Sequence, residues 1–351
     1  MTNAWVAALD HTIVSGQPDA MGARALIDPS LRVAYPADFP ALTGRPTPAR
    51  LASLAKALQG YDLICTYNWG AMDVVMAHRV FAGQLGLPPL VHHEDGFNED
   101  EAARLKPARN LYRRAALMGA AKLVVPSTGL EAIALSVWHQ PRAKVERIPN
   151  GIDTAAFAAT PNPAALPIAK PAGQHWVGTL AGLRAVKQLP LLVEEMTALP
   201  ENWHLVIVGE GPERSAILAA AAAHGIAHRV HLPGAVADPA SVVGLFDIFA
   251  LSSASEQFPL SVVEAMAAGL PIAAPAVGDI AAMVSEPNRP HITAPGDPQA
   301  LGQALAQLAA DPALRAQIGA ANQAKARTEY DFAAMLARYR AVYEGAMGRV
   351  F

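Results

Sequence analysis

Residues 256–271 read Glu-Gln-Phe-Pro-Leu-Ser-Val-Val-Glu-Ala-Met-Ala-Ala-Gly-Leu-Pro, a pattern that predicts a loop followed by a helix. It follows an apolar run at 248–251 that is typical of a buried strand, and its closing Gly-Leu-Pro is typical of the end of a helix. Ser261 and Glu264 have the spacing of a capping box, so we expect the helix to begin at Ser261. Its open N–H groups would then point beyond the end of the strand, where anions bind.

The two glutamates of this stretch, Glu256 and Glu264, have two interpretations. Glu264 could serve only to cap its helix, with Glu256 as a solvated loop residue. Their seven-residue separation inside E-Q-F-P-L-S-V-V-E, however, resembles the donor-sugar motif of retaining glycosyltransferase family 4, whose members have the GT-B fold. The resemblance implies that a nucleotide sugar binds beside this helix.

The composition fits two domains without a nucleic-acid partner. A length of 351 residues exceeds what one core normally supports, and an apolar fraction of 52% is enough for two. The formal net charge of −3 argues against nucleic acid as the main partner. One cysteine, Cys65, cannot form an intrachain disulfide, and the N-terminus lacks the pattern of a signal peptide, so we expect a cytoplasmic protein. No apolar stretch has the length of a membrane-spanning helix.

Strand and helix patterns alternate through both halves of the chain, which predicts an α/β fold. Residues 149–153, Pro-Asn-Gly-Ile-Asp, have turn chemistry and resemble the hinge signature of family 4. We therefore expect a Rossmann-like acceptor-side domain at 1–150 and a Rossmann-like donor domain at 151–330. The resemblance adds a helix at 331–351 that crosses back to the first domain. In such a GT-B fold two doubly wound domains face a central cleft, with ligands beyond the carboxyl ends of the strands.

The N-terminal domain departs from the family pattern at its start. Members of the family open with a strand and a glycine-rich loop, whereas residues 1–9 already resemble the helix that follows that loop. We expect this first strand and its loop to be missing from residues 1–150.

A donor diphosphate calls for cations and N–H dipoles, because negative charge grows on the leaving group in the transition state. Residues 177–187 resemble the family segment ending Gly-Arg-Leu-x-Pro-Val-Lys, in which an arginine and a lysine hold the phosphates. Lys187 matches that lysine, although a lone lysine before a helix would be read as a surface residue. The arginine position is Gly182, and the nearest candidate to replace it is Arg184. The resemblance implies no metal and no cofactor besides the nucleotide sugar.

The same resemblance assigns roles around the helix N-terminus. Glu264 resembles the residue that accepts hydrogen bonds from the nucleotide ribose, and Glu256 the one that binds hydroxyls of the transferred sugar. A carboxylate suits both tasks because each of its oxygens can accept from one hydroxyl. Backbone N–H groups of Leu260 and Ser261 are expected to face the phosphates or the sugar. Phe258 either lines the sugar pocket or packs in the core.

Gly211 lies in the turn Gly-Glu-Gly-Pro at 209–212. This turn lacks the third glycine of the dinucleotide fingerprint, so it is weak evidence for NAD. In family 4 the turn borders the donor site, which makes Gly211 a candidate donor contact.

In the N-terminal domain, His92 resembles the family histidine that ends a strand at the cleft. It would meet a sugar hydroxyl or the oxocarbenium-like part of the transition state. The alternatives are a hydrogen-bonded loop and a metal site, and the second is disfavoured because no His, Cys and Asp set has zinc-like spacing. Residues 66–70 also follow a strand and are expected near the acceptor, or else form a turn packed by two aromatic rings.

Positive charge gathers in the first half of the chain. Residues 1–150 carry 15 Lys and Arg against 13 Asp and Glu, whereas residues 151–351 carry 12 against 17. The region 104–122 holds six of these cations: Arg104, Lys106, Arg109, Arg113, Arg114 and Lys122. It is either a solvated face or a docking site for anionic lipid headgroups at the inner face of the membrane. The second possibility follows from the lipid-linked acceptors of many family 4 enzymes.

The sequence as a whole predicts a metal-independent glycosyltransferase. It would move a hexose-type sugar from a nucleotide-diphosphate donor to a hydroxyl of a saccharide or lipid-linked acceptor, with retention, in cell-surface polysaccharide or glycolipid synthesis. Two alternatives stay open. One is a non-catalytic sugar-nucleotide-binding scaffold, to which Gly182 and the missing first strand point; the other is a different GT-B enzyme, such as a sugar-nucleotide epimerase or a phosphorylase.

Overall fold

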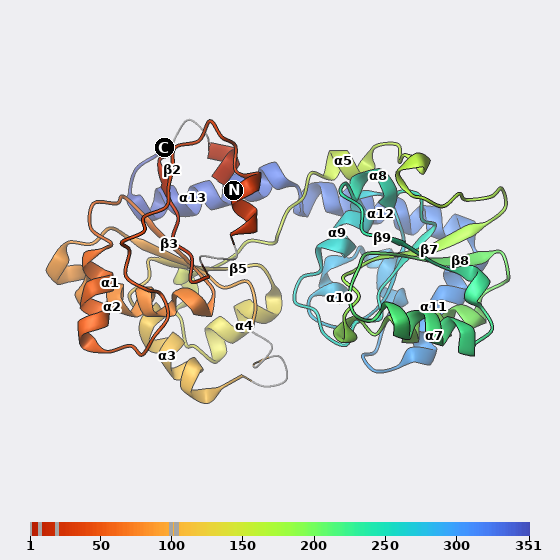
Figure 1. Ribbon diagram of the computed structural model, residues 1–351, viewed down its shortest axis with the longest axis horizontal. Helices are drawn as coiled ribbons and strands as arrows, with labels where there is room; N and C mark the ends of the chain where they lie inside the picture. Colours follow the sequence, from red (N-terminus) through yellow and green to blue (C-terminus); the bar gives the residue numbers. More distant parts are fainter. Residues whose placement is uncertain (1, 6–8, 18–20, 98–100, 102–104) are drawn as a thin grey trace. The chain divides into compact units, whose positions relative to one another are not determined.

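The structure is a computed structural model that describes residues 2–5, 9–17, 21–97, 101 and 105–351. Its internal contacts divide the chain into two compact units, each an α/β assembly (Figure 1). Unit 1 comprises Met1–Ile148 with Leu336–Phe351, and unit 2 comprises Pro149–Met335. The chain leaves unit 1 next to the turn at 149–153 and returns to it within the last helix.

Unit 1 is built on a four-stranded parallel sheet with the order β3-β4-β5-β6. Its strands are β3 (Ile64–Tyr67), β4 (Leu90–His93), β5 (Lys122–Val125) and β6 (Val145–Arg147). The helices packed with them are α1 (Pro48–Lys56), α2 (Met72–Leu85), α3 (Pro107–Leu117) and α4 (Thr128–Ser136). All four helices contribute to one apolar core with the sheet.

The sequence pattern of residues 99–117 predicts one continuous helix, and α3 covers only the second part of that range. It begins at Pro107, because proline suits the first turn of a helix and disfavours helical backbone in the residue before it. Residues 99, 100 and 102–104 of the predicted helix lie outside the described residues. The same holds for residues 1 and 6–8 of the helix expected at 1–9, of which Thr2–Trp5 form a 3-10 turn.

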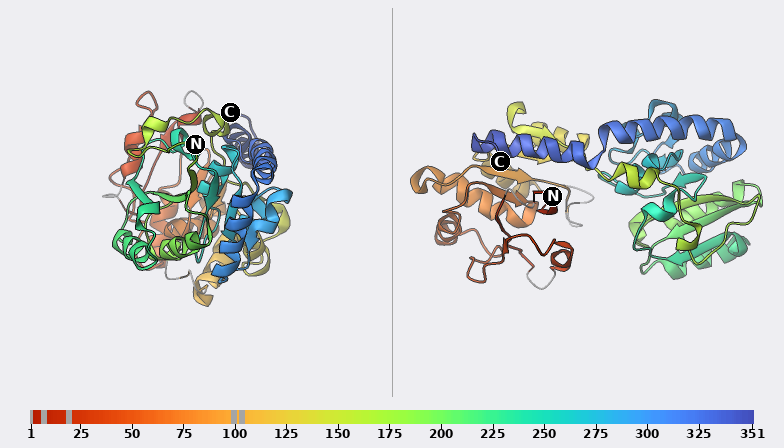
Figure 2. Two further views of the ribbon diagram at one scale, coloured as in Figure 1. Left: turned by 90° about the vertical axis from the view of Figure 1, so that its right-hand side faces the viewer. Right: turned by 90° about the horizontal axis from the view of Figure 1, so that it is seen from above.

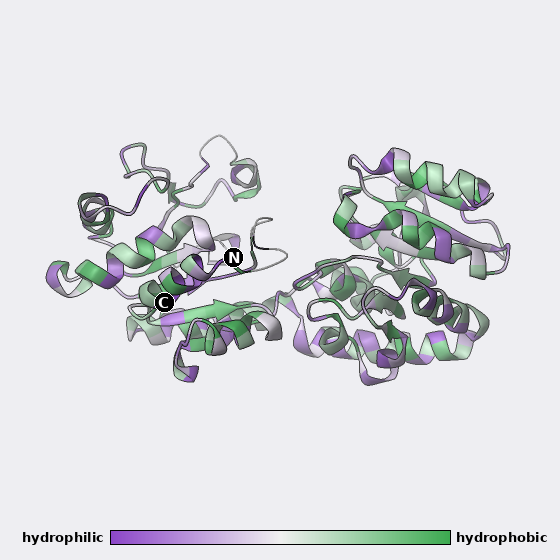
Figure 3. Cartoon of the chain, turned by 90° about the horizontal axis from the view of Figure 1, so that it is seen from below, coloured by the Kyte–Doolittle hydropathy of each residue, from purple (hydrophilic) through white to green (hydrophobic). Residues whose placement is uncertain are grey.

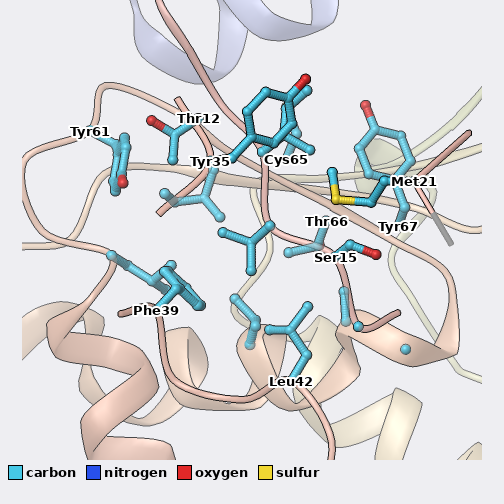
Figure 4. A pocket seen from close by; sticks show the side chains of 18 of the residues that line it. Thr12, Ser15, Met21, Tyr35, Phe39, Leu42, Tyr61, Cys65, Thr66 and Tyr67 are labelled. Atoms are coloured by element: carbon cyan, nitrogen blue, oxygen red, sulfur yellow. The ribbon is translucent and has the colours of Figure 1, made fainter. Parts of the chain in front are cut away.

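A separate two-stranded parallel sheet, β1 (His11–Thr12) with β2 (Val33–Ala34), lies in the same unit. Residues around β1 and along β3 line a cavity of about 500 Å³, shown in Figure 4 with Thr12, Tyr35 and Cys65 among its lining side chains. Cys65 is one of the residues that line this cavity. Burial by the surrounding protein raises the pKa of its thiol to about 12, so it is not a ready nucleophile at neutral pH.

Unit 2 is a six-stranded parallel sheet with the order β12-β11-β10-β7-β8-β9. Its strands are β7 (His175–Leu180), β8 (Trp203–Val208), β9 (Val230–Gly234), β10 (Ile248–Ala250), β11 (Ile272–Pro275) and β12 (Ile292–Thr293). Its helices are α5 (Thr154–Ala158), α6 (Leu189–Glu195), α7 (Arg214–Ala223), α8 (Ala240–Val243), α9 (Leu260–Ala267), α10 (Ile280–Met283), α11 (Pro298–Ala310) and α12 (Pro312–Glu329). Two apolar cores, one on each face of the sheet, explain why its central strands are apolar without alternation (Figure 3).

The last helix, α13 (Phe332–Met347), begins in unit 2 and continues into unit 1 (Figure 2). Its Tyr343 hydroxyl lies 2.9 Å from Nε2 of His93 at the end of β4. The His93 ring also stacks on Tyr67, with centroids 4.5 Å apart. Burial lowers the pKa of His93 to about 3, so this ring joins the helix to the sheet in its neutral form.

A buried amide network holds α12 against the start of β11 in unit 2. Asn288 forms two hydrogen bonds of 2.8 Å with the backbone of Ile272, accepting its N–H and donating to its C=O. Asn322 donates to the C=O of Leu270 at 2.8 Å and to Oδ1 of Asn288 at 2.7 Å. It also accepts from the N–H and the hydroxyl of Ser285. Both side chains are fully buried, so no water can replace these bonds.

We expect Asn322→Leu to lower the free energy of unfolding of unit 2 by about 2–3 kcal/mol, because a side chain of similar volume would leave several buried polar groups without partners. Urea unfolding measures this loss. Gln323→Ala is the matched control one residue away, where a single partly buried bond to the C=O of Ala267 is lost and about 1 kcal/mol is expected. Equal losses in the two variants would contradict the importance of the network.

Candidate functional site

The candidate site is formed by loops that follow the carboxyl ends of neighbouring strands in unit 2. The loop after β7 is tied to the loop after β8, because the N–H of Leu183 donates to the C=O of Glu210 at 2.9 Å. It is tied to the loop after β10 as well, because the N–H of Ala254 donates to the C=O of Val186 at 2.9 Å. Parallel strands bring these loops to one edge of the sheet, and the backbone bonds then fix their relative positions.

Gly278, after β11, is part of this arrangement and was not singled out from the sequence. Its φ is +57°, and a Cβ at this position would lie 2.4 Å from the carbonyl oxygen of Glu256. The N–H of Asp279 donates to the C=O of Gln257 at 3.1 Å. A side chain at residue 278 would therefore displace the backbone that carries Glu256.

Lys187 and Glu256, predicted to bind different parts of the donor, contact each other directly. Their Nζ and Oε1 atoms are 2.5 Å apart, and their side chains are 15% and 11% exposed. The hydroxyl of Ser252 donates to the C=O of Lys187 at 2.9 Å, which holds the lysine backbone beside the loop after β10. This places one cation and one carboxylate side by side at the partly open edge of the sheet.

Helix α9 begins one residue earlier than predicted, at Leu260, and its N-cap is Pro259 without a side-chain cap. Ser261 is therefore the second residue of the helix, and the predicted capping box of Ser261 and Glu264 is wrong. The cause is the Pro-Leu pair, since a proline already supplies extended backbone before the first helical residue. The N–H groups of Leu260 and Ser261 have no acceptor among the described residues and are open to a ligand.

Glu264 lies in the second turn of α9 and takes no part in capping the helix. Its side chain is partly buried and has no hydrogen-bond or ion-pair partner in the part of the chain that the structure describes. Burial raises the pKa of this carboxyl. A half-buried carboxylate without a partner costs stability, and such groups are typical of ligand-binding sites.

Arg184 lies next to the glycine that stands at the family arginine position. A Cβ at Gly182 would be 3.6 Å from Nε of Arg184, so the arginine side chain folds over the space that a side chain at residue 182 would enter. Arg184 is exposed and has extended backbone dihedrals. It directly precedes the short 3-10 turn Ala185–Lys187. Its guanidinium is thus in the same loop as Lys187.

Phe258 and Gly211, two other predicted donor contacts, both contact neighbouring parts of unit 2. Phe258 packs edge to face on Tyr330, with centroids 5.7 Å apart, and against the core of unit 2, which is the second of its two expected roles. At Gly211 a Cβ would lie 2.5 Å from the carbonyl oxygen of Leu183, so this glycine permits the contact between two loops. Its contact with the donor remains a prediction.

His92, predicted to be catalytic, is fully buried in unit 1. Its Nδ1 lies 2.8 Å from the hydroxyl of Thr66, and its Nε2 lies 3.6 Å from Oε2 of Glu94, which is too long for a hydrogen bond. The ring has no exposed surface on which a sugar hydroxyl could bind, contrary to the expectation. Sequence position alone did not show this, because the whole of β4 is buried under neighbouring elements.

The exposed residue nearest to His92 after β4 is Asp95, two positions beyond the end of the strand, which the sequence analysis did not select. Its N–H donates to Oδ1 of Asn68 at 2.7 Å, and the N–H of Asn68 donates to the C=O of His93 at 2.8 Å. Desolvation by the surrounding protein and the charge of Glu94 raise the pKa of Asp95. Asn68, with φ of +55°, thus joins the loops after β3 and β4. Polar residues directly after two adjacent strands are the sequence feature from which Asp95 could have been predicted.

The basic region 104–122 is only partly a surface. Arg113 is fully buried and forms a bidentate pair with Glu101 at 3.2 and 3.1 Å, under the rings of Trp69 and Trp138. Arg109 also pairs with Glu101, at 3.0 Å. These two arginines are not available to lipid headgroups as predicted, and Arg104 lies outside the described residues.

Among the described residues, no group of three or more His, Cys, Asp and Glu side chains could hold a metal ion. No helix in the same part of the chain has both the length and the apolar character needed to cross a bilayer.

The candidate donor site in unit 2 consists of five elements: Lys187, Arg184, Glu256, Glu264 and the N-terminus of α9.

The chain matches two protein-family models, one in each unit. Residues 174–311 match the model described as glycosyl transferases group 1, and residues 1–151 match the model described as a glycosyl transferase 4-like domain. The first match contains the whole candidate donor site. Together the two matches span most of the chain.

Curated relatives with sequence similarity are glycosyltransferases. D-inositol 3-phosphate glycosyltransferase of Thermobispora bispora is 27% identical over 313 residues, covering 81% of this chain and 73% of that protein. 2-deoxystreptamine glucosyltransferase of Streptomyces kanamyceticus is 30% identical over 141 residues, covering 39% of this chain and 36% of that protein.

Solved structures share the fold at lower sequence identity. HepE of Anabaena, determined in complex with UDP, has a TM-score of 0.71 and 20% identity, covering 85% of this chain and 82% of that chain. Sucrose-phosphate synthase of Thermosynechococcus elongatus has a TM-score of 0.71 and 23% identity, covering 92% and 84%. The predicted α/β fold with two Rossmann-like domains is thereby confirmed. With the two family matches, these similarities show that the chain belongs to the group 1 glycosyltransferases, family 4, of the GT-B fold.

Proposed function

We propose that this glycosyltransferase moves a hexose-type sugar from a nucleoside diphosphate donor to an acceptor hydroxyl, with retention at the anomeric carbon and without a metal. The observation that carries the proposal is the contact of Lys187 with Glu256 at 2.5 Å. In the donor, one bond joins the anomeric carbon to the diphosphate, so the groups that bind the sugar and the phosphate must lie side by side. A lysine and a glutamate in contact satisfy that requirement.

Stabilisation of the leaving group follows from the charges in the same loops. Lys187 and Arg184 would meet the phosphates as cations, and the open N–H groups at the start of α9 would add preorganised dipoles. As the bond from the anomeric carbon to the phosphate oxygen breaks, the acceptor oxygen bonds to that carbon on the same face. The acceptor proton passes to the departing phosphate, so no side chain acts as a covalent nucleophile.

Recognition of the donor divides between the two glutamates. Glu264, partly buried and without a partner in the described residues, would accept hydrogen bonds from the two ribose hydroxyls. Glu256 would accept from hydroxyls of the transferred sugar. Binding would thus give Glu264 partners that the described part of the chain does not supply.

The relatives suggest which substrates to try first. HepE has been determined with UDP and with UDP-glucose, and the named acceptors of two relatives are D-inositol 3-phosphate and 2-deoxystreptamine, which are small cyclic polyols or aminopolyols. We propose a nucleotide sugar of the same kind as UDP-glucose as the donor. The acceptor would be a saccharide or a lipid-linked sugar in cell-surface polysaccharide or glycolipid synthesis, and small polyols belong in the same screen.

Thermal shift with a panel of nucleoside diphosphates, followed by donor-consumption assays, tests the proposal. Binding with transfer to an acceptor supports it. Binding without any turnover in the wild-type protein would favour the non-catalytic scaffold. Formation of an epimer without acceptor, or a requirement for inorganic phosphate, would favour the other GT-B chemistries.

Lys187→Ala should weaken binding of the donor nucleoside diphosphate by about 1.5–3 kcal/mol, the usual contribution of a charge-assisted contact. Glu256→Gln should bind the nucleotide nearly as well as wild type and lose about a hundredfold or more in transfer rate. The double variant should bind the nucleotide more tightly than Lys187→Ala, because it no longer leaves Glu256 as an unpaired anion beside the phosphates. Calorimetry and initial rates measure these effects, and equal affinity losses in both single variants would contradict the roles.

Glu264→Gln should weaken nucleotide binding by about tenfold. It should leave the unliganded protein at least as stable as wild type at neutral pH, because it removes a partly buried charge. Burial raises the pKa of Glu264, so its destabilising effect is complete above that pKa, shrinks as the pH falls below it, and is absent below the ordinary glutamate value. Urea unfolding of both proteins at neutral and acidic pH checks this; a variant that is less stable at neutral pH would indicate a structural role.

Arg184→Ala should weaken diphosphate binding by about tenfold if this residue replaces the family arginine. Adding Gly182→Arg to that variant should restore the affinity, since a Cβ at residue 182 meets no atom closer than 3.6 Å and an arginine fits there. Calorimetry with the diphosphate compares the three proteins. Unchanged affinity in Arg184→Ala would show that this guanidinium is only a surface charge.

A further inference from the structure

One face of unit 1 combines exposed apolar side chains with cations. Leu111 and Arg114 lie on α3, and Met118 is the residue that caps its end with helical backbone. They are three, four and seven residues apart and so share one side of the helix. Leu111 is 68% exposed and Met118 is 57% exposed. Helix α2 lies beside α3 (Figure 1). Its Val80 is 56% exposed. Large apolar side chains this exposed, close together, are typical of interaction surfaces.

Cations border these apolar side chains. A Cβ at Gly119 would lie 2.7 Å from Cδ of Arg79, so the arginine of α2 lies beside the end of α3. Nζ of Lys144 donates to the C=O of Met118 at 2.6 Å, and Nζ of Lys122 donates to the C=O of Ala143 at 2.8 Å. The two lysines bind carbonyl groups, and neither has a carboxylate partner in the part of the chain that the structure describes.

The surface that results is called here the α2–α3 face. It consists of seven residues: Arg79, Val80, Leu111, Arg114, Met118, Lys122 and Lys144. Arg79 and Arg114 are exposed, and neither has a carboxylate partner within the described residues. Residues 74–93, 105–130 and 132–145, from which the face is built, contain no Asp or Glu at all. The nearby Glu131 is engaged by Arg142 and Arg147.

We propose that the α2–α3 face docks this glycosyltransferase on an anionic lipid bilayer, with Leu111 and Met118 entering the headgroup region and the four cations contacting lipid phosphates. The proposal replaces the region 104–122 expected from the sequence, since it omits the paired Arg109 and Arg113 and includes Arg79 and Lys144. It stands independently of the sugar-transfer proposal, because it concerns a different surface and needs no donor.

The mixed character of the face favours a bilayer over a soluble polyanion. A soluble polyanion would bind the cations and gain nothing from exposed Leu111 and Met118, whereas a bilayer interface accepts apolar side chains and cations together. Each cation near an anionic bilayer is expected to raise the partition constant about fivefold. An apolar side chain that enters the interface adds a comparable factor.

Vesicle pelleting tests the proposal with the whole protein, using phosphatidylcholine vesicles with and without phosphatidylglycerol. Wild type should pellet only with the anionic vesicles. The triple variant Arg79→Gln, Arg114→Gln, Lys144→Gln should lose about a hundredfold in partition constant. The double variant Leu111→Ser, Met118→Ser keeps every charge and should lose about tenfold.

The control is the triple variant Lys56→Gln, Arg289→Gln, Arg327→Gln, which makes the same charge change at exposed positions elsewhere. It should bind within about twofold of wild type, and urea unfolding should show all variants folded. Equal pelleting with neutral and anionic vesicles, no pelleting at all, or an equal loss in the control would overturn the proposal. Wild-type vesicle binding by the Leu111→Ser, Met118→Ser variant, together with binding to soluble heparin, would identify a polyanion site instead.

Discussion

The close backbone contact between loops at the carboxyl edge of the unit 2 sheet is the constraint on which the candidate site depends. Backbone bonds join the loop after β7 to those after β8 and β10, and the loop after β10 to the one after β11. The approach at Gly278 leaves no room for a side chain. Because backbone hydrogen bonds set the positions of these loops, Lys187 and Glu256 are held in contact with each other.

Buried and half-buried charges serve two different purposes in this chain. In unit 1, Arg113 is enclosed by aromatic rings and satisfied by Glu101, which makes the charge part of the core. In unit 2, Glu264 has no such partner among the described residues, and its raised pKa reflects the free energy lost by burial. A satisfied charge stabilises a core, whereas an unsatisfied one at a sheet edge keeps its hydrogen-bonding capacity for a ligand.

Local patterns succeeded where local chemistry is enough and failed where neighbours intervene. Strand, loop and helix at 248–268 were predicted from an apolar run and a Gly-Leu-Pro stop. The predicted cap at Ser261 was wrong because Pro259 is the N-cap of α9 and the helix begins at Leu260. Arg113, expected at the surface, is buried and pairs with Glu101, which lies six residues before α3 begins. His92 matched a motif, but burial of the whole of β4 closed its ring to solvent.

The alternating α/β pattern and the family could be predicted from the amino-acid sequence alone. These depend on apolar periodicity and on short motifs, which are properties of neighbouring residues. Only the tertiary structure decided that Lys187 touches Glu256 across 69 positions of sequence, that Arg184 covers Gly182, and that Arg79 and Lys144 share a face with α3. Such contacts arise from the packing of loops and helices whose partners are distant in the chain, and no local pattern encodes them.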